Sequence, residues 1–288
     1  MMTIQALIKE GTQVLERVTV TAALDTQWIL CDLLDMQRGQ LLIHGNRQVS
    51  EDQVLTFRAH LARRASGEPL QYVLGHQEFM GLLFHVSQDV LIPRQDTEVL
   101  VETILTRLKG NDQPKILDIG VGSGAISCSL AHFIDQAQVR GLDISDGALA
   151  MARRNAKSLG LEDRVTYNKG DLFSLEKTLV EGVDSYDVIV SNPPYIPSED
   201  ILTLQQGVKD HEPMLALDGG QDGYDCYKAL VAQAHLYMKE NGILAFETGH
   251  DQARTIGRMM EDSGHYDRIE IIKDLAGIER VVLGYKKA

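Results

Sequence analysis

Two hydrophobic patterns divide the chain. From Met1 to about Gly67 the apolar residues recur at helical spacing, whereas from Lys115 onward short apolar runs, rich in β-branched residues, alternate with helical stretches. The first pattern is typical of a small helical bundle, and the second of a mostly parallel sheet with helices on both faces. Between them, β-type residues on either side of Gly81 predict a hairpin. The predicted parts are a helical domain over residues 1–74, a β-hairpin connector over 75–95 and a sheet domain over 96–288.

The sheet domain is predicted to have seven strands in a Rossmann-like α/β arrangement. We place the strands near Lys115–Ile119, Gln138–Asp143, Val165–Asn168, Asp187–Ser191, Ile243–Glu247, Arg268–Lys273 and Glu279–Leu283. The helices are expected near Asp96–Leu108, Ser123–Phe133, Asp146–Leu159, Cys226–Lys239 and Asp251–Glu261. Asp96 or Thr97 is the predicted cap of the first of these helices.

The helical domain contains two clear local signals. Leu24, Trp28, Cys31 and Leu34 form an apolar stripe on a predicted helix, which favours a core position for Trp28. Ser50 and Gln53 have the spacing of a capping box, so a helix is expected to begin there.

One predicted strand ends in the loop Asn192-Pro193-Pro194-Tyr195. Two prolines supply no backbone N–H, so the strand must stop, and the loop is stiff because each residue before a proline is restricted to extended backbone. The Asn192 amide oxygen and the Pro193 carbonyl are two acceptors suited to the two N–H bonds of a planar NH₂ group. The Tyr195 ring is expected to cover the face of that group. A plain turn after a core strand is the alternative, and the upstream motifs decide against it.

The upstream motif is a glycine loop, Gly120-Val121-Gly122-Ser123-Gly124, between the first strand and its helix. Glycines allow the backbone to turn tightly and to approach a ligand closely. The spacing differs from Gly-x-Gly-x-x-Gly, which disfavours a dinucleotide. Asp143, at the end of the second strand, is placed to accept the hydroxyl protons of a ribose. After the third strand, Asp171 is placed to accept from an adenine amino group, and Leu172 to pack on its face. Together these features favour S-adenosylmethionine over NAD.

Composition limits the class of protein. The 288 residues are 44% hydrophobic and 24% charged, which is ordinary for a globular protein, and no apolar run is long enough to span a bilayer. The start of the chain lacks the layout of a signal peptide, so a cytoplasmic protein without a membrane partner is expected. The net charge of −13 disfavours stable nucleic-acid binding. The three cysteines lack metal-ligand spacing, and no metal or disulfide is predicted.

At this point the chain resembles the class I methyltransferases and, more narrowly, the release factor glutamine methyltransferases (the PrmC, formerly HemK, family). The similarity runs over almost the full length. The motifs that carry it are Glu68-Pro69-Leu70-Gln71-Tyr72, Gly75 with Phe79, Ile92-Pro93-Arg94, Thr97-Glu98, the glycine loop, Ser191 to Tyr195, Glu212-Pro213, Gly219-Gly220 with Asp222-Gly223, Phe246-Glu247 and Arg280-Val281-Val282. Gln95, where the family usually has Pro, and Thr248, where it usually has Ile, depart from the pattern.

The resemblance implies an enzyme that methylates the side-chain nitrogen (N5) of the glutamine in the Gly-Gly-Gln motif of class 1 peptide chain release factors. It implies S-adenosylmethionine as cofactor and S-adenosylhomocysteine as product. The residues implied at the cofactor are Gly120, Val121, Gly122, Ser123, Gly124, Asp143, Asp171, Leu172 and Asn192. Those implied at the glutamine are Asn192, Pro193, Pro194 and Tyr195, with Asn192, Pro193 and Tyr195 catalytic. The helical domain would help to grip the release factor, and a monomer is expected.

Three other interpretations remain at this stage. A methyltransferase acting on the N6 nitrogen of adenine would share the Asn-Pro-Pro-Tyr loop, although the acidic chain disfavours it. A binding module without turnover and a dehydrogenase are less consistent with the intact glycine loop and Asn192. Arg94 and Glu98 are expected either to pair with each other or to cap the nearby helix, and neither is predicted to be catalytic.

Overall fold

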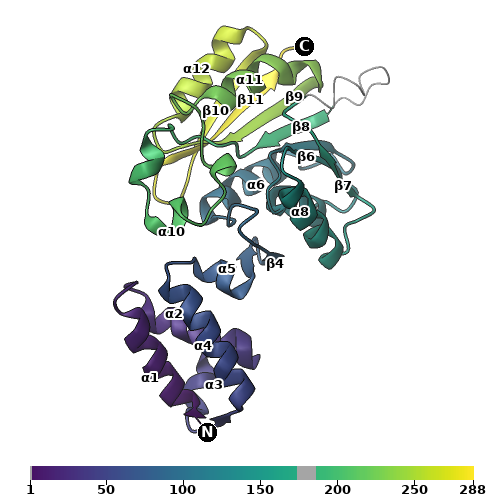
Figure 1. Ribbon diagram of the computed structural model, residues 1–288. Helices are drawn as coiled ribbons and strands as arrows, with labels where there is room; N and C mark the ends of the chain where they lie inside the picture. The colour runs from purple at the N-terminus through teal and green to yellow at the C-terminus, as the bar shows by residue number, and fades with distance from the viewer. Residues whose placement is uncertain (1, 174–185) are drawn as a thin grey trace. The chain divides into compact units, whose positions relative to one another are not determined.

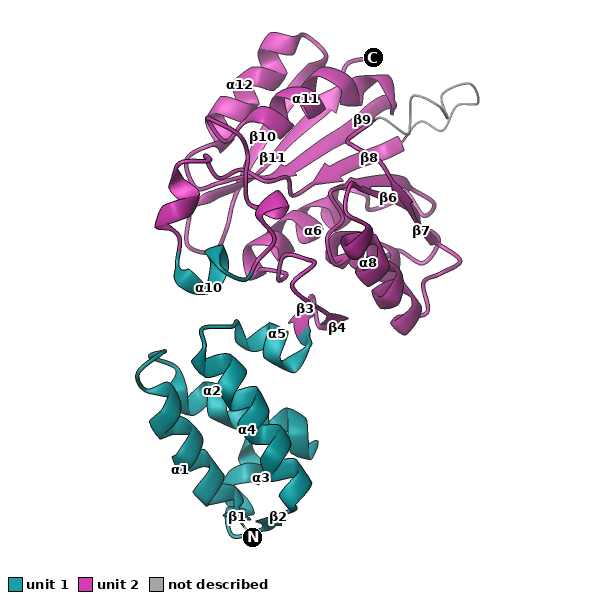
Figure 2. Cartoon of the chain, viewed as in Figure 1, with its two compact units in different colours: residues 1–76, 205–211 teal, residues 77–204, 212–288 magenta. Residues whose placement is uncertain are grey.

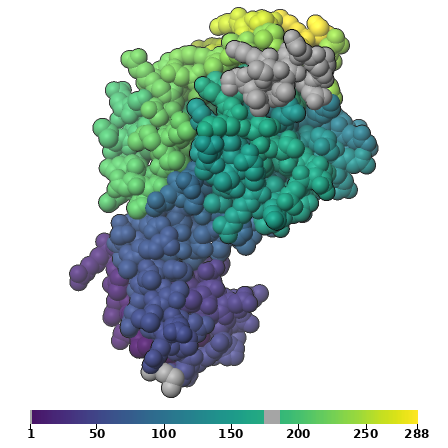
Figure 3. Space-filling view, turned by 45° about the vertical axis from the view of Figure 1, so that its right-hand side comes forward, coloured from purple at the N-terminus to yellow at the C-terminus, as the bar shows by residue number. Residues whose placement is uncertain are grey.

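The computed structural model describes residues 2–173 and 186–288, which form two compact units. Unit 1 comprises residues 1–76 and 205–211, and unit 2 comprises 77–204 and 212–288 (Figure 2). Colouring along the sequence gives the N-terminal helices purple to blue and the sheet unit blue to yellow (Figure 3). Among the described residues, no helix has the length and apolar character needed to cross a bilayer.

Unit 1 is mainly helical, as the apolar spacing predicts. Its elements are β1 (Met2–Thr3), α1 (Ile4–Leu15), α2 (Ala22–Leu34), α3 (Arg38–Ile43), β2 (Gln48–Val49), α4 (Glu51–Ala65), α5 (Leu70–Leu74) and α10 (Gln206–Lys209). The expected capping box is present, because Ser50 Oγ accepts from the Gln53 N–H and the Gln53 side chain accepts from the Ser50 N–H. Phe57 and Leu30, both fully buried, lie in its core.

The core position predicted for Trp28 is wrong. Its side chain is 44% exposed, and the guanidinium carbon of Arg38 lies 5.8 Å from the ring centroid. Helix α2 instead buries a face that includes Ile29 and the polar residue Asp25. Asp25 is buried because its carboxylate accepts a hydrogen bond from Arg64 Nε at 2.7 Å. A buried ion pair therefore selects the inward face of α2, and apolar spacing alone does not reveal it.

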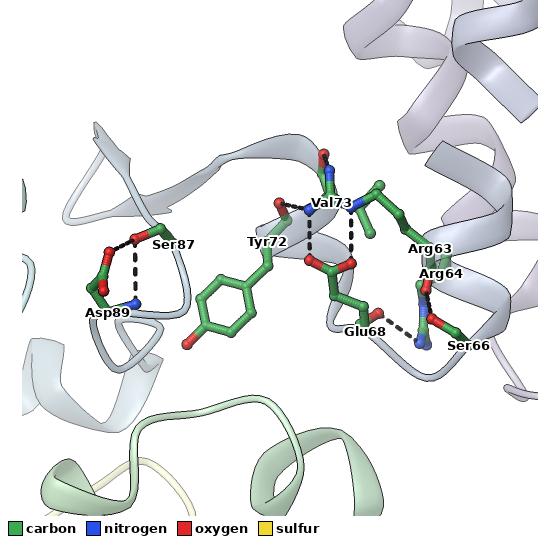
Figure 4. A network of polar contacts seen from close by, with 8 residues as sticks. All are labelled: Arg63, Arg64, Ser66, Glu68, Tyr72, Val73, Ser87 and Asp89. Carbon is green, nitrogen blue, oxygen red and sulfur yellow. Dashed lines mark hydrogen bonds and ion pairs between the residues drawn. The ribbon is translucent and has the colours of Figure 1, made fainter. Parts of the chain in front are cut away.

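A polar network shapes the end of unit 1 that contains the Glu68-to-Tyr72 motif (Figure 4). Arg63 Nε donates to Glu68 Oε2 at 2.9 Å, and Arg63 Nη2 donates to the Tyr72 carbonyl at 2.9 Å. Arg63 Nη1 also donates to the Val73 carbonyl at 3.3 Å. These carbonyls belong to the short helix α5, so a single guanidinium ties its last turn to α4 and to Glu68.

Unit 2 is a seven-stranded sheet with helices on both faces. Its elements are β3 (His76–Phe79), β4 (Leu82–His85), α6 (Gln95–Arg107), β5 (Lys115–Ile119), α7 (Ala125–Phe133), β6 (Gln138–Asp143), α8 (Asp146–Ser158), β7 (Val165–Lys169), β8 (Tyr186–Ser191), α11 (Asp225–Gln233), β9 (Met238–Glu247), α12 (Ala253–Ser263), β10 (Tyr266–Lys273) and β11 (Glu279–Lys286). The strand order is β10-β11-β9-β8-β5-β6-β7. Only the pairs β9–β11 and β10–β11 are antiparallel among the described pairs of this sheet.

Two hydrophobic cores lie on opposite faces of the sheet, because successive side chains of a strand point to opposite faces. On β5, Ile116 joins the core beneath α6, α7 and α8, whereas Leu117 joins the core beneath α11 and α12 (Figure 1). On β8, Val188 joins the first of these cores and Ile189 the second. Burial on both faces explains why the strands are nearly continuous apolar runs that are recognisable in the sequence.

The expected hairpin is present as β3 and β4, with Met80 and Gly81 both at positive φ in its turn. The predicted cap of α6 is wrong, because the helix begins at Gln95 with Arg94 at the N-cap. The predicted helix over Cys226–Lys239 is shorter, since α11 ends at Gln233 and β9 already begins at Met238.

Candidate active site

The carboxyl ends of three strands meet at one edge of the sheet. Ile119 on β5 is in register with Ser191 on β8, which is in register with Phe246 on β9. Ser191 Oγ also donates to the Ile119 carbonyl at 2.6 Å. From β5 the chain continues to β6 and β7 on one side of β5, and then crosses to β8 on its other side. The strand order therefore reverses between β5 and β8. Such a topological switch point is where open α/β sheets bind ligands.

A cavity of about 260 Å³ lies at this edge, within unit 2. Ten of the twelve residues that the sequence predicts for the site line it: Gly120, Val121, Gly122, Ser123, Asp143, Asp171, Leu172, Asn192, Pro193 and Pro194. Gly124 and Tyr195 do not. The cavity therefore brings together the glycine loop, the ends of β6 and β7, and the Asn-Pro-Pro loop.

The glycine loop forms its wall of the cavity through the backbone. Gly120 has φ +77° and Gly122 has φ +52°, and no heavy atom of the described residues lies within 4 Å of the position that a Cβ would take at either one. Larger side chains there would be strained and would occupy the cavity. Gly124 has another function: a Cβ there would lie 2.7 Å from the Tyr167 hydroxyl, so glycine allows close packing behind the loop.

Asp143 is held in place by two backbone N–H groups. Its Oδ2 accepts from Gly122 at 3.0 Å, and its Oδ1 accepts from Ser145 at 2.9 Å. Each carboxylate oxygen has a further lone pair, so the group can still accept from a ligand. The Asp143 carboxylate therefore fits a ribose diol at the cavity edge.

The end of β7 supplies a polar and an apolar group. Asp171 and Leu172 both line the cavity. Leu172 has φ +50°, in the left-handed region that costs a leucine about 1 kcal/mol. Strained residues of this kind concentrate at ligand sites. An acceptor beside an exposed apolar surface fits an adenine ring.

The Asn192 side chain is oriented by Thr97, which lines the same cavity, and by the buried Glu247. Its Nδ2 donates to Thr97 Oγ1 at 3.2 Å, and it also hydrogen-bonds to the Glu247 carboxyl group. With the nitrogen engaged there, the amide oxygen is left for the cavity that Asn192 lines. Every peptide bond of the described residues is trans, Pro193 and Pro194 included.

Tyr195 lies next to this loop but packs against the core on the α11 and α12 face. Burial raises the pKa of its hydroxyl to about 12, and its carbonyl accepts from Gln252 Nε2 at 3.0 Å. The ring is therefore a support for the loop in this structure, and it does not line the cavity.

Of the two alternatives expected for Arg94 and Glu98, pairing with each other is wrong, whereas Arg94 does stand at the N-cap of α6. Arg94 lines the cavity and forms an ion pair with Glu212, whose carboxyl is buried. Burial raises the pKa of Glu212, against the opposite effect of Arg94. Glu98 Oε1 instead accepts from the Met80 N–H at 2.6 Å, in the hairpin turn. Within the described part of the chain, His, Cys, Asp and Glu residues form no group of three or more suited to a metal ion.

Thr97 and Glu247 belong to motifs that carry the family resemblance, but the sequence interpretation assigned neither of them to the site. Glu247 is 2% exposed, and burial raises the pKa of its carboxyl to about 7. Thr97 was expected to cap α6 but is 5% exposed and faces Asn192. The available signal was a glutamate at the end of the apolar run Ile243–Phe246, since buried carboxyl groups are rare without a partner.

Comparison with known proteins follows the two units. The family model described as the PrmC N-terminal domain matches residues 6–75, and that described as a methyltransferase domain matches residues 111–281. A release factor glutamine methyltransferase of Geobacter sulfurreducens is 44% identical over 269 residues, which cover 93% of this chain and 91% of that protein. One from Clostridium acetobutylicum is 38% identical over 262 residues, covering 91% and 90%.

Solved structures agree on the fold. A methyltransferase from Pyrococcus furiosus is 16% identical with a TM-score of 0.50, and the match covers 83% of this chain and 100% of that one. The catalytic domain of hMettl16, in complex with an RNA hairpin, is 12% identical with a TM-score of 0.56, and the match covers 83% of this chain and 82% of that one. Identities this low support a shared methyltransferase fold.

Proposed function

The chain belongs to the release factor glutamine methyltransferase family, and from this premise we propose that it methylates the side-chain amide nitrogen (N5) of the glutamine in the Gly-Gly-Gln motif of class 1 peptide chain release factors. The observation that carries the proposal is the Asn192 carboxamide. Its nitrogen is engaged by Thr97, and it lines a cavity at the switch point of a methyltransferase fold. That arrangement leaves two acceptors, Asn192 Oδ1 and the Pro193 carbonyl, for the NH₂ group of a glutamine.

S-Adenosylmethionine is the cofactor that the cavity fits. The backbone of Gly120 and Gly122 would lie against it, Asp143 would accept from its ribose, and Asp171 with Leu172 would hold the adenine. When bound, this cofactor supplies an electrophilic methyl group on a sulfonium, and S-adenosylhomocysteine is the product.

The protein contributes mainly by positioning. A glutamine amide nitrogen is a poor nucleophile because its lone pair is delocalised into the carbonyl. Hydrogen bonds to Asn192 Oδ1 and the Pro193 carbonyl would orient the nitrogen and stabilise the positive charge that develops on it. The proton then leaves to water. Tyr195, with its carbonyl held by Gln252, would keep the loop in shape from behind.

The remaining parts of the chain have a proposed role in substrate choice. Residues 1–74 would bind the body of the release factor, and the connector over 75–95 would join that domain to the methyltransferase domain over 96–288. We propose that the chain acts as a monomer.

The test is methyl transfer from labelled S-adenosylmethionine to a purified class 1 release factor. A copy of that factor with the Gly-Gly-Gln glutamine replaced by alanine is the control. We expect label on the first and none on the second. Equal labelling of both would exclude the proposed residue, and no labelling of either, with the cofactor bound, would exclude the proposed substrate.

A further inference from the structure

The two ends of the Asn192 carboxamide have nearly the same shape and opposite hydrogen-bonding character. With Oδ1 toward the cavity, the group accepts from a substrate NH₂. With the amide flipped, Nδ2 would face that NH₂ and two donors would oppose each other. Productive binding of an amide nitrogen therefore needs a device that fixes the orientation of Asn192.

Thr97, which lines the cavity with Asn192, and the buried Glu247 form a directional chain with this side chain. Asn192 Nδ2 donates to Thr97 Oγ1 at 3.2 Å, and the Thr97 hydroxyl bonds to the Glu247 carboxyl. An ionised carboxylate only accepts hydrogen bonds, so the Thr97 hydroxyl must donate to Glu247. The Thr97 oxygen is then left to accept from Asn192, and the Glu247 carboxyl also accepts directly from the Asn192 side chain. Both bonds engage the Asn192 nitrogen and leave its oxygen for the substrate.

We propose that Glu247, directly and through Thr97, is a positioning residue that holds the Asn192 carboxamide with its oxygen toward the substrate nitrogen. The inference rests on the proposed methyl transfer to an amide. Glu247 is 2% exposed and Thr97 is 5% exposed, so bulk water does not compete for these bonds. Among the described residues, Glu247 Oε2 has no hydrogen-bond partner, as is also the case for Asp118 Oδ1 and Glu212 Oε2.

The surroundings of Glu247 allow its charge to change near neutral pH. Burial raises the pKa of this carboxyl to about 7; Asp96 raises it further, while Arg280 and the bonds from Thr97 and Asn192 lower it. Tyr195, in the loop after β8, and Tyr227, on α11, also face it. Arg280 is shared, with ion pairs to Asp96 at 3.0 Å and to Asp274 at 3.2 Å.

Protonation would give Glu247 a donor of its own. A protonated carboxyl, like the side chain of Gln, can donate to Thr97 and so permit the reversed chain. Glu247 is charged only above its pKa, so methyl transfer should fall as pH drops through about 7. The variant Glu247→Gln should lack this dependence.

The experiment compares wild type, Glu247→Gln, Thr97→Val, Thr97→Ser and the double variant Thr97→Val/Glu247→Gln, with labelled S-adenosylmethionine and a purified release factor. We expect kcat to fall roughly 10- to 100-fold in Glu247→Gln, with the cofactor Kd changed less than about threefold. The loss in Thr97→Val should be smaller, because the direct bond from Asn192 to Glu247 remains. Thr97→Ser keeps the hydroxyl and should keep kcat within about threefold of wild type. Because Glu247→Gln already removes the carboxylate on which both bonds depend, the double variant should lose no more than Glu247→Gln alone.

Full kcat in Glu247→Gln, a Thr97→Ser loss equal to that of Thr97→Val, or additive losses in the double variant would overturn the positioning role alone. If Glu247→Gln does not fold, the comparison of Thr97→Val with Thr97→Ser tests the positioning role. Equal losses of kcat in these two variants would overturn it. Absence of label with the wild-type chain would instead overturn the proposed function, and the positioning role with it.

Discussion

The two loops that face each other across the cavity are built in different ways. The glycine loop contributes its backbone, and its requirement is the absence of a side chain at Gly120 and Gly122. The Asn192 loop contributes a side chain whose direction depends on Thr97 from α6 and Glu247 from β9. The first loop is therefore specified by its own residues, whereas the second is specified by residues far away in the sequence.

Each loop also has a buried carboxyl group near it, Asp118 for the glycine loop and Glu247 for the Asn192 loop. Asp118 is fully buried and accepts from the Ser127 N–H at 3.1 Å, in α7, while Glu247 bonds to Thr97 and Asn192. Burial raises the pKa of both groups to about 7. Both carboxyl groups are costly to bury. Asp118 accepts from the backbone of a helix, whereas Glu247 bonds to a side chain that lines the cavity.

The largest effect is expected from Asn192→Ala, which removes the side chain that the second loop exists to present. Loss of one preorganised hydrogen bond to the reacting group should lower kcat by about 10²- to 10³-fold, since the Pro193 carbonyl remains. Cofactor binding, followed by calorimetry, should be largely retained because the glycine loop and Asp143 are unchanged. Near-normal turnover would contradict the role given to Asn192.

Gly122→Ala should break the first loop. The added methyl group would enter the cavity, so cofactor affinity should fall by about tenfold to a hundredfold. Gly160→Ala is a matched control: Gly160 has φ +67° and an open Cβ position but does not line the cavity. Both variants should lose about 1 kcal/mol of stability from backbone strain. Equal loss of cofactor affinity in the two would show that strain, and not the cavity, is responsible.

Asp118→Asn should change stability with little effect on turnover. Burial raises the pKa of native Asp118 to about 7, whereas the ordinary pKa of an aspartate side chain is 3.8. Because the native state binds more protons between these values, the stability that Asp118 contributes falls as pH rises and is lost above about 7. Urea unfolding should therefore find the variant roughly 1 to 3 kcal/mol more stable than wild type near pH 8, and less so near pH 5.

At saturating substrates, kcat of Asp118→Asn should stay within about threefold of wild type. A large loss of kcat would remove the distinction between the two buried acids.

The smallest effect is expected from Gln95→Pro, which restores the residue usual in the family. Gln95 is the first residue of α6, where proline is well tolerated, and Arg94 before it is already extended at φ −104° and ψ 149°. Melting and methyl transfer should both stay close to wild type, within about 0.5 kcal/mol in stability. A larger destabilisation would mean that the Gln95 side chain or N–H has a role at the cavity edge.

The sequence predicted what depends on local pattern. The strands of the sheet were found within a few residues because strands buried on both faces are continuous apolar runs. The glycine loop and Asp143 were identified because they follow directly after strands. Thr248, the second departure from the family, remains fully buried and donates to the Arg280 carbonyl at 3.4 Å.

What the sequence missed depends on pairs of distant residues. The ion pair of Asp25 with Arg64 orients α2 so that Trp28 is exposed. Arg94 forms an ion pair with Glu212 and not with the nearby Glu98. Thr97 looked like a helix cap because its partner, Asn192, lies 95 positions away. Local sequence pattern could therefore not predict how side chains are oriented at the cavity. It could still identify Asn192 as a site residue.

The separation of Thr97 from Asn192 also bears on how the enzyme forms. Contacts between residues far apart in a chain require closure of long loops and are made late in folding. The Asn192 loop obtains its supports from α6 before it and from β9 after it, so neither support is local to the loop. A folding intermediate with β5 to β8 in place would already have its glycine loop and would still lack a directed Asn192. Catalytic competence should then appear after cofactor binding during refolding, as a separate and slower kinetic phase.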